Sequence, residues 1–373
     1  MEMIRLEECC EILDSMRVPI TAKDRKNGSY PYYGANGVQD YVADYIFDDD
    51  LVLLAEDGGN FGSEERPIAY RISGKCWVNN HAHVLKPKEG IDVDYLCYSL
   101  MFYKVDGMVN GATRKKLTQA AMRKMLIPAR RMEKQKEIVN ILNKVQNLIE
   151  IEKEQIKKYD EIIKSRFVEM FGDPVHNPYG FEISTIGDCY KVKGGKRIPK
   201  GMGYANGITE HPYLRATDMK NATILDRDIK YISNETYQHI KNYTVSGGDI
   251  YLTNVGVNLG MAGVIPEKYN GANLTENAVK LVPVQDKLIG IYLSYYINSP
   301  GVQRYIMERK MTVGVPKLAI FRIESMPLLV PSISLQKQFA SFVKQANNLQ
   351  STAHQSLKKL QTLQKSLMQQ YFT

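Results

Sequence analysis

Polar and aromatic side chains that could contact nucleic-acid bases gather at Gly-rich turns in both halves of this 373-residue sequence. Asn can pair bidentately with adenine and Arg with guanine, while Lys and Arg can hold phosphates. In the first half the candidates are Tyr32, Tyr33, Asn36, Asn60, Asn80, His81, Arg114, Lys115 and Lys116. In the second half they are Arg215, Thr217, Asn254, Asn258, Asn277, Lys310 and Lys317. These side chains suit a DNA-contacting surface, although Asn, Gly and Tyr also mark ordinary turns and basic runs are often solvated faces.

Sequence signatures of catalytic sites are incomplete. Gly195-Lys196-Arg197 lacks the leading Gly and the hydroxyl residue of a phosphate-binding P-loop. Asn177-Pro178-Tyr179 is one Pro short of the tetrapeptide of an amino-methyltransferase, and we interpret it as a turn. The glycines at 256, 260 and 263 could cradle a phosphate, but in a strand-rich region a hairpin is favoured. Neither half shows a spaced Ser/His/Asp set, so we expect a chain without catalytic residues.

Signals for metals, cofactors and compartment are weak as well. His81 and His83 could ligate a metal, but no third ligand is evident nearby, and an alternating strand is favoured. The five cysteines include no CxxC pair, so we expect neither a metal nor a disulfide framework. We find no membrane-spanning apolar run and no signal-peptide pattern, and we expect a cytoplasmic protein. The net charge of +8 favours a polyanionic partner without proving one.

The elements that must position these residues begin with one long amphipathic helix, predicted from Met132 to Phe171. No Pro or Gly interrupts this stretch, and its apolar residues recur at spacings of three and four. At 1.5 Å per residue such a helix would be roughly 58 Å long. Gly172 and Pro174 end it, as a Gly just past a helix end followed by Pro should.

The same helix recurs at the C-terminal end of the sequence. Gln135-Lys136 corresponds to Gln336-Lys337, and Asn147-Leu148 corresponds to Asn348-Leu349. Both helices carry apolar faces that should partly remain free for partner proteins. The residues that we expect on these docking faces are Ile138, Ile141, Val145 and Leu148 in the first helix and Phe339, Phe342, Leu349 and Leu363 in the second.

The two globular parts are repeated too. The apolar strand Leu51 to Ala55, with its Gly-rich loop, corresponds to Ile250 to Leu252 with its own loop. Strands are also predicted at 38–47 and 82–85, and helices at 93–103 and 289–305. The sequence therefore predicts an α+β chain that is internally duplicated. The predicted divisions are a globule at 1–131, a helix at 132–171, a linker at 172–182, a globule at 183–330 and a helix at 331–373.

This arrangement resembles the specificity subunit of a type I restriction-modification system. The motifs that carry the resemblance are Asp50-Leu51-Val52-Leu53, the stretch from Asp249 to Asn254, Gln135 to Val139, and Phe167 to Pro174. The resemblance implies two mixed, strand-rich target-recognition domains, two long antiparallel coiled-coil helices and a pseudo-two-fold repeat. Each domain would recognise one half of a bipartite, asymmetric site in double-stranded DNA.

The resemblance also implies partners. The helices would dock two methyltransferase (modification) subunits, which would bind S-adenosylmethionine, and separate restriction/translocase subunits would move along DNA and cut it. The chain itself would be non-catalytic and would hold no cofactor. Two other interpretations stay open: the specificity domain of a nuclease or methyltransferase with its own unrecognised active site, and a coiled-coil scaffold that binds only protein.

Overall fold

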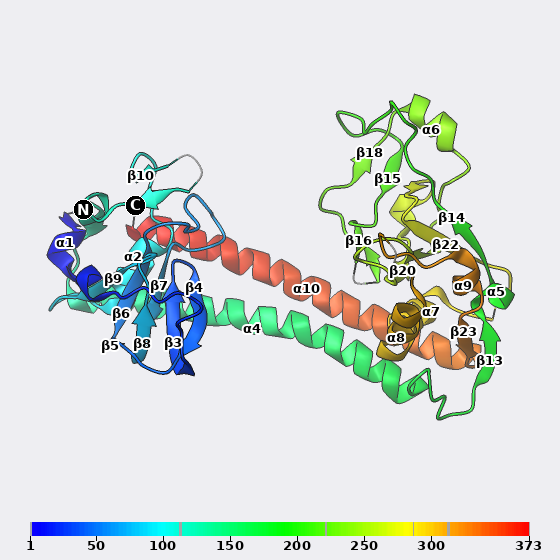
Figure 1. Cartoon of the computed structure of the whole chain (residues 1–373), viewed down its shortest axis with the longest axis horizontal. Helices are drawn as coiled ribbons and strands as arrows, with labels where there is room; N and C mark the ends of the chain where they lie inside the picture. The colour runs from blue at the N-terminus through cyan, green and yellow to red at the C-terminus, as the bar shows by residue number, and fades with distance from the viewer. Residues whose placement is uncertain (1, 112–113, 221, 286, 312–313, 373) are drawn as a thin grey trace. The chain divides into compact units, whose positions relative to one another are not determined.

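A computed structural model describes residues 2–111, 114–220, 222–285, 287–311 and 314–372 (Figure 1). The chain divides into two compact units: unit 1 comprises residues 1–154 and 354–373, and unit 2 comprises residues 155–353. Each of the two long helices contributes one part to unit 1 and one part to unit 2. The domain boundaries predicted from the sequence remain predictions. They treat the two long helices as separate segments, whereas each helix is divided between the two units.

Unit 1 contains two four-stranded sheets. The first has the order β2 (Cys10–Ile12), β9 (Ala82–Pro87), β6 (Leu51–Ala55), β7 (Ala69–Ile72), with antiparallel neighbours. The second has the order β4 (Gly37–Val42), β3 (Asn27–Gly34), β8 (Lys75–Val78), β5 (Phe47–Asp48), with β3 and β8 parallel. Two short pairs join β1 (Met3–Arg5) to β12 (Leu126–Pro128) and β10 (Val109–Asn110) to β11 (Lys116–Leu117). The helices of unit 1 outside the two long ones are α1 (Leu6–Cys9), the 3-10 turn η1 (Asp14–Met16), α2 (Val93–Met101) and α3 (Gln119–Arg123).

The central strand β6 is buried on both faces, which explains its continuous apolar sequence. Val52 and Leu54 belong to a core shared with α2, whereas Leu51 and Leu53 belong to the core that includes residues of the second sheet. The helix α2 begins where the Asp92 side chain accepts hydrogen bonds from the backbone N–H groups of the first turn. The predicted strand at 38–47 is wrong in its extent, because a bend at 43–46 separates β4 from β5.

Unit 2 repeats this plan. Its main sheet has the order β14 (Tyr190–Gly194), β22 (Ala278–Pro283), β19 (Ile250–Thr253), β20 (Ala262–Val264), again antiparallel. Its second sheet has the order β18 (Lys230–Tyr231), β15 (Pro212–Leu214), β21 (Asn273–Leu274), with β15 and β21 parallel like β3 and β8. Short pairs join β13 (Glu182–Thr185) to β23 (Pro327–Val330) and β16 (Met219–Lys220) to β17 (Thr223–Ile224). The duplication inferred from sequence is confirmed by this shared strand order.

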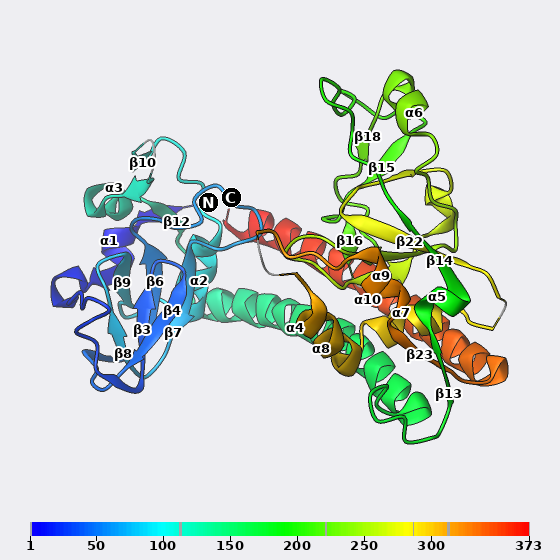
Figure 2. The ribbon, with the colours of Figure 1, turned by 45° about the vertical axis from the view of Figure 1, so that its right-hand side comes forward.

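The helices of unit 2 correct one prediction. Apart from the two long helices, they are α5 (Ile186–Cys189), α6 (Asn234–Ile240), the 3-10 turn η2 (Glu267–Tyr269), α7 (Gly290–Ile297), α8 (Pro300–Arg309) and α9 (Ile320–Glu324). The single helix expected at 289–305 is wrong, because α7 ends at Ile297 and α8 begins anew at Pro300 (Figure 2). Proline has no backbone N–H and suits the first turn of a helix, so it marks the restart. The hairpin predicted around Gly256 and Gly260 is confirmed, because β19 and β20 pair on either side of them.

The two long helices are α4 (Met132–Phe171), over the range that the apolar spacing predicts, and α10 (Ile333–Phe372). In unit 1 the Glu152 side chain meets Ser356, and Gln146 meets Gln364, so the helices run antiparallel. In unit 2 the Phe167 ring packs against the Phe339 ring. The side-chain amide of Gln350 in α10 donates to the carbonyl of Ile156 in α4, which shows that the helices run antiparallel here as well. No helix in the described ranges is long and apolar enough to cross a membrane.

A buried glutamine near the start of each long helix fixes it to the globular part of its unit. Gln135 is fully buried; its Oε1 accepts from the Asp92 N–H, and its Nε2 donates to the carbonyls of Gly90 and Arg130 at 2.8 Å each. Gln336 does the same in unit 2, with the Ile289 N–H and with the carbonyls of residues 287 and 331. The repeated Gln-Lys dipeptide of the sequence therefore has a structural cause.

Candidate nucleic-acid interface

Three loops meet at one edge of each unit, held by the same backbone hydrogen bonds. In unit 1, Glu56 and Asp57 donate their N–H groups to the carbonyl of His81, and Gly58 donates to the carbonyl of Lys115. The chain returns through a 2.7 Å bond from the N–H of Leu117 to the carbonyl of Glu56. We call the three segments 56–62, 79–81 and 114–117 the loop edge of unit 1.

Unit 2 has an equivalent loop edge, formed by segments 254–260, 275–277 and 314–318. Asn254 and Val255 donate their N–H groups to the carbonyl of Asn277, and Gly256 donates to the carbonyl of residue 316. The N–H of Leu318 bonds to the carbonyl of Asn254 at 2.9 Å. The two edges therefore share one pattern of backbone hydrogen bonds, while their side chains differ. This combination would suit contacts with two different nucleotide sequences.

The loop edge of unit 1 carries a compact ionic group. The Oδ1 atom of Asp57 lies 2.6 Å from Nδ1 of His81 and 2.7 Å from Nη2 of Arg114. Lys116 forms a 2.9 Å ion pair with Glu56. The guanidinium of Arg114 and the ammonium groups of Lys115 and Lys116 remain exposed to solvent, so this edge still presents cations to a polyanion.

Beneath this edge lies a buried network centred on His83. Its Nδ1 is 2.6 Å from the Asp14 carboxylate, its Nε2 is 2.9 Å from the carbonyl of Leu117, and Glu56 completes a group whose potential ligand atoms lie within 4.8 Å. The sequence argument that no third ligand lies near His83 is therefore wrong. Both carboxylates already have a cationic partner, however, since the Arg17 guanidinium lies 2.7 Å from Glu56 and 3.5 Å from Asp14.

This geometry favours an ion-pair network over a metal site. Burial acts to raise the pKa of Asp14, but the hydrogen bonds from His83, from the Val84 N–H and from Gln119 together outweigh burial and hold the pKa below its ordinary value. Burial likewise acts to raise the pKa of Glu56, and hydrogen bonds from Arg17 and Lys116 hold it below its ordinary value. Both carboxylates are therefore ionised and hydrogen-bonded, and a metal ion would have to displace these partners.

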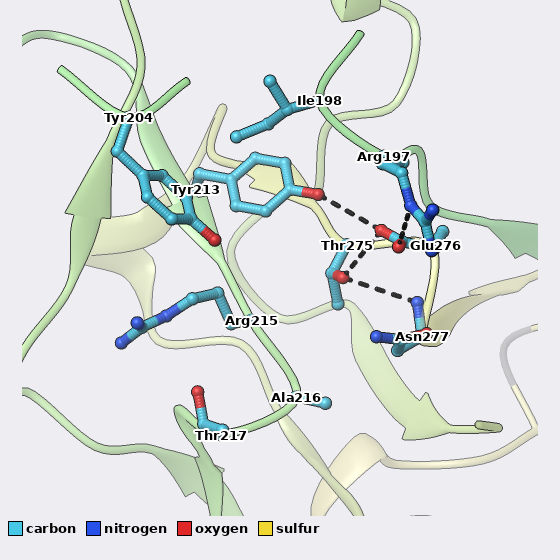
Figure 3. Close-up of a pocket in the computed structure, with 10 residues that line it drawn as sticks. All are labelled: Arg197, Ile198, Tyr204, Tyr213, Arg215, Ala216, Thr217, Thr275, Glu276 and Asn277. Atoms are coloured by element: carbon cyan, nitrogen blue, oxygen red, sulfur yellow. Dashed lines mark hydrogen bonds and ion pairs between the residues drawn. The ribbon is translucent and has the colours of Figure 1, made fainter. Parts of the chain in front are cut away.

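In unit 2 a pocket of about 460 Å³ opens beside the loop edge (Figure 3). Its lining brings together three of the predicted contacts, Arg215, Thr217 and Asn277. The other residues of the lining, which sequence reasoning missed, are Arg197, Ile198, Tyr204, Tyr213, Ala216, Thr275 and Glu276. In the sequence Arg197-Ile198-Pro199 matches Arg17-Val18-Pro19 of the first half, but nothing in the sequence places Arg197 beside Glu276.

The pocket lining combines charged, polar and aromatic side chains. Arg197 Nε donates to Glu276 Oε1 at 2.6 Å, as Figure 3 shows. Burial acts to raise the pKa of Glu276, but the contact with Arg197, a backbone N–H and the Thr275 hydroxyl together outweigh burial and lower the pKa. Burial raises the pKa of Tyr213 to about 12, and its hydroxyl donates to the carbonyl of Lys196. The pocket thus offers a mixture of donors, acceptors and ring surface at neutral pH.

Arg215 is oriented by acidic neighbours. Its guanidinium bonds to both oxygens of Asp218, at 2.7 and 3.1 Å, and reaches Asp228 at 3.3 Å. The hydrogen bond with Asp218 raises the pKa of Arg215. A guanine contact by Arg215 would have to compete with these carboxylates, so its side chain is better placed to shape the pocket than to reach outward.

Two predicted DNA contacts, Tyr32 and Asn254, are buried. Tyr32 is 1% exposed, and its hydroxyl accepts a hydrogen bond from the Ile20 N–H. Asn254 is 5% exposed, and its Nδ2 lies 3.4 Å from the carbonyl of Leu318. The prediction for Asn254 does not fit this structure, because the returning segment 314–318 covers the exit of β19. Both side chains support the fold here.

The other predicted contacts lie at least partly at the surface. The exposed ones are Asn36, Asn80, Arg114, Lys115, Lys116, Thr217 and Lys317, and the half-buried ones are Tyr33, Asn60, His81, Arg215, Asn258, Asn277 and Lys310. Two of these amides also hold loops, since Asn36 donates to the carbonyl of Gly58 and Asn60 to that of Pro67. Contact with DNA stays a prediction for each of them.

The long helices bury some of the predicted docking residues and expose others. Ile138, Val145 and Phe339 are buried within their own units, so they hold the helices together. Ile141 and Phe342 are half-buried. The exposed ones are Leu148 at 48%, Leu349 at 55% and Leu363 at 47%, and the exposed residues Ile151, Ile162 and Val168 join them. A docking face on these helices would therefore be narrower than the sequence predicts.

The described part of the chain is a duplicated fold, with one loop edge in each unit and a helix pair that both units share, and this arrangement suits recognition at two sites. The sequence model of the type I restriction modification DNA specificity domain matches residues 1–159 and 178–362. The chain belongs to this family of type I specificity subunits, which are the non-catalytic members of their complexes.

Individual relatives agree with the family match. The chain is 32% identical over 240 residues to a putative type I restriction enzyme specificity subunit of Haemophilus influenzae, over 63% of this chain and 60% of that protein. The match therefore spans less than two thirds of that relative. This chain is also 22% identical over 350 residues to the type I restriction enzyme MjaIX specificity subunit of Methanocaldococcus jannaschii, over 87% of this chain and 78% of that protein.

Two solved structures share the fold. One is the type I restriction-modification S subunit of M. genitalium, with a TM-score of 0.55 and 13% identity over 100% of this chain and 96% of that one. The other comes from work on complex assembly and conformational transition of a type I system, with a TM-score of 0.60 and 13% identity over 99% and 97% of the two chains. At this identity they show the common architecture.

Proposed function

We propose that this chain recognises a bipartite, asymmetric DNA sequence, with unit 1 and unit 2 each contacting one half-site through its loop edge. The observation that carries the proposal is the shared backbone frame of the two edges with unlike side chains upon it. His81 and Asn277 occupy the same place in that frame, as do Lys115 and Pro316. A common scaffold with different contacting groups suits two half-sites of different sequence.

Exposed cations would hold the phosphate backbone at both edges. Lys115 and Arg114 project from unit 1, and Lys317 projects from the equivalent segment of unit 2. Phosphate contacts fix the register of a protein on the duplex, while base contacts supply the sequence preference. The pocket beside the edge of unit 2, with Thr217 and Asn277 in its lining, is the strongest place for base-edge contacts.

The helices would serve as spacer and docking surface. We propose that the exposed residues Leu148, Leu349 and Leu363 contact methyltransferase subunits, two for each copy of this chain. Those subunits would bind S-adenosylmethionine and methylate adenine, and restriction/translocase subunits would join the same complex. This chain would act in the cytoplasm and would contribute recognition alone. The alternative of a nuclease or methyltransferase with its own active site is not favoured, because the family model covers both halves of the chain.

Reconstitution tests the proposal. The chain is purified together with its cognate methyltransferase, and binding to a DNA library is followed by sequencing of the bound fraction. The expected result is one split motif with a fixed gap. Binding with no sequence preference, or a single uninterrupted motif, would refute the proposal. A chain that methylates DNA without any partner would instead support the alternative.

A further inference from the structure

One apolar side chain stands almost wholly in solvent at the loop edge of unit 2. Val257 is 99% exposed, at the turn between β19 and β20. A single exposed valine is ordinary on a protein surface, so its exposure alone does not indicate a contact. The question is therefore whether the turn holds Val257 in place.

Bonds on both sides hold this turn. The carbonyl of Thr253 accepts from the N–H of Gly260 at 2.8 Å, and the Thr253 hydroxyl donates to the carbonyl of Asn258. Gly256 binds the neighbouring segment through the carbonyl of residue 316. Leu259, two residues past the tip, is 4% exposed and lies in the main core of unit 2. The side chain of Val257 is thus presented outward by an anchored turn.

The surroundings of the turn are polar and cationic. The adjoining segment carries Lys317, which is exposed and whose backbone bridges to Val255. Asn258 follows the tip directly, and Asn277 lies at the base of the turn. A single valine among such groups offers far less apolar area than a protein interface needs. Its size does suit contact with one methyl group of a base in a DNA groove.

Unit 1 has no apolar group at this point. Gly58 is equivalent to Gly256, because each donates its N–H to the third segment of its loop edge. The residue that follows is Gly59 in unit 1, where unit 2 has Val257. A Cβ atom on Gly59 would lie 2.4 Å from the Cβ of Ala55, so this position cannot take a side chain without rearrangement. The apolar contact is therefore specific to unit 2.

We propose that Val257 is a specificity-determining residue that packs against the C5 methyl group of one thymine in the half-site recognised by unit 2. This inference rests on the proposed function, since it requires the loop edge to face DNA. Thymine is distinguished in the major groove by its methyl group, and apolar side chains are the groups that detect it.

Thymine-to-deoxyuridine replacement tests the inference, because deoxyuridine keeps base pairing and lacks only the methyl group. The complex of the chain with its methyltransferase is titrated with duplexes in which each thymine of the recognition sequence is replaced singly. At one thymine of the unit 2 half-site, wild-type binding should weaken about four-fold, the value of one buried methyl group. Val257→Ala should bind the two duplexes equally at that position and should keep the wild-type preference at every thymine of the unit 1 half-site.

Two controls make the result decisive. Val257→Ala should keep the wild-type unfolding temperature, since its side chain is solvent-exposed. Val315→Ala, a change at a 64% exposed valine of the adjoining segment, should retain the preference for thymine. The inference is overturned if Val257→Ala keeps the full preference, if Val315→Ala alone abolishes it, or if the unit 2 half-site contains no A·T pair. Absence of any sequence-specific binding by the wild-type complex would instead refute the proposed function itself.

Discussion

Replacing Gln135 with Ala should loosen unit 1 at the junction between its globular part and α4. The substitution removes one acceptor and two donated hydrogen bonds, which leaves the Asp92 N–H and the carbonyls of Gly90 and Arg130 without that partner. Gly90 lies in an exposed position, where water can replace the amide. The other two groups are partly buried, and each should cost about 1–3 kcal/mol when unpaired.

The expected total is about 3 kcal/mol, which corresponds to roughly a hundredfold faster opening. Hydrogen exchange followed by mass spectrometry on the chain with its methyltransferase can measure this locally. Protection should fall around the start of α2 in unit 1 and stay unchanged in unit 2. Gln336→Ala should produce the mirror result, with faster exchange around the start of α7.

Lys136→Ala is the matched control, because Lys136 is the exposed neighbour of Gln135 on the same helix. Its exchange pattern should match the wild type. If Gln135→Ala leaves the amides near Asp92 within about threefold of wild-type exchange, the two glutamines do not anchor the helices, and the repeated dipeptide has another cause.

Three further outcomes are expected. Leu148→Asp with Leu349→Asp should weaken association with the methyltransferase at least about tenfold, as for a docking hot spot, and leave the unfolding temperature unchanged; titration calorimetry checks the association and scanning calorimetry the unfolding temperature. Deleting seven residues within 145–162 together with seven within 346–363 should shorten the gap between the half-sites and preserve both half-site sequences, and motif mapping with changed bases would contradict it. The folded state lowers the pKa of Asp14, so this carboxylate stabilises unit 1 above about pH 4 and loses that effect below it. Asp14→Asn should therefore flatten the acid limb of the stability curve, and acid titration of wild type and variant should show no difference if the network is unimportant.

The sequence predicts the large elements of this fold because they depend on local patterns. Apolar spacing without Pro or Gly defines α4 from Met132 to Phe171, and a continuous apolar run defines β6. The break between α7 and α8 was also readable, since Pro300 has no N–H to continue a helix. The internal repeat suggested one continuous helix, but the backbone follows the local effect of the proline.

The candidate site is less predictable because it depends on segments that are distant in sequence. Asn254 follows a buried strand, where side chains often reach the surface, but the segment ending at Leu318 returns and covers it. The contact between Arg197 and Glu276 joins residues on different strand ends. Val257 is not among the predicted contacts because those are polar or aromatic and valine is neither. Its position between two glycines of a loop is nevertheless visible in the sequence.

The most direct measurement of the central claim is a methylation map of DNA from a host that carries this chain and its methyltransferase. The same map is made with a chimera in which residues 183–330 are replaced by the corresponding segment of another specificity subunit of known motif. We expect the wild type to give one split motif. The chimera should exchange one half-site for the donor's and keep the other half-site and the gap. A chimera that methylates well but changes both half-sites, or neither, would contradict recognition by two independent units.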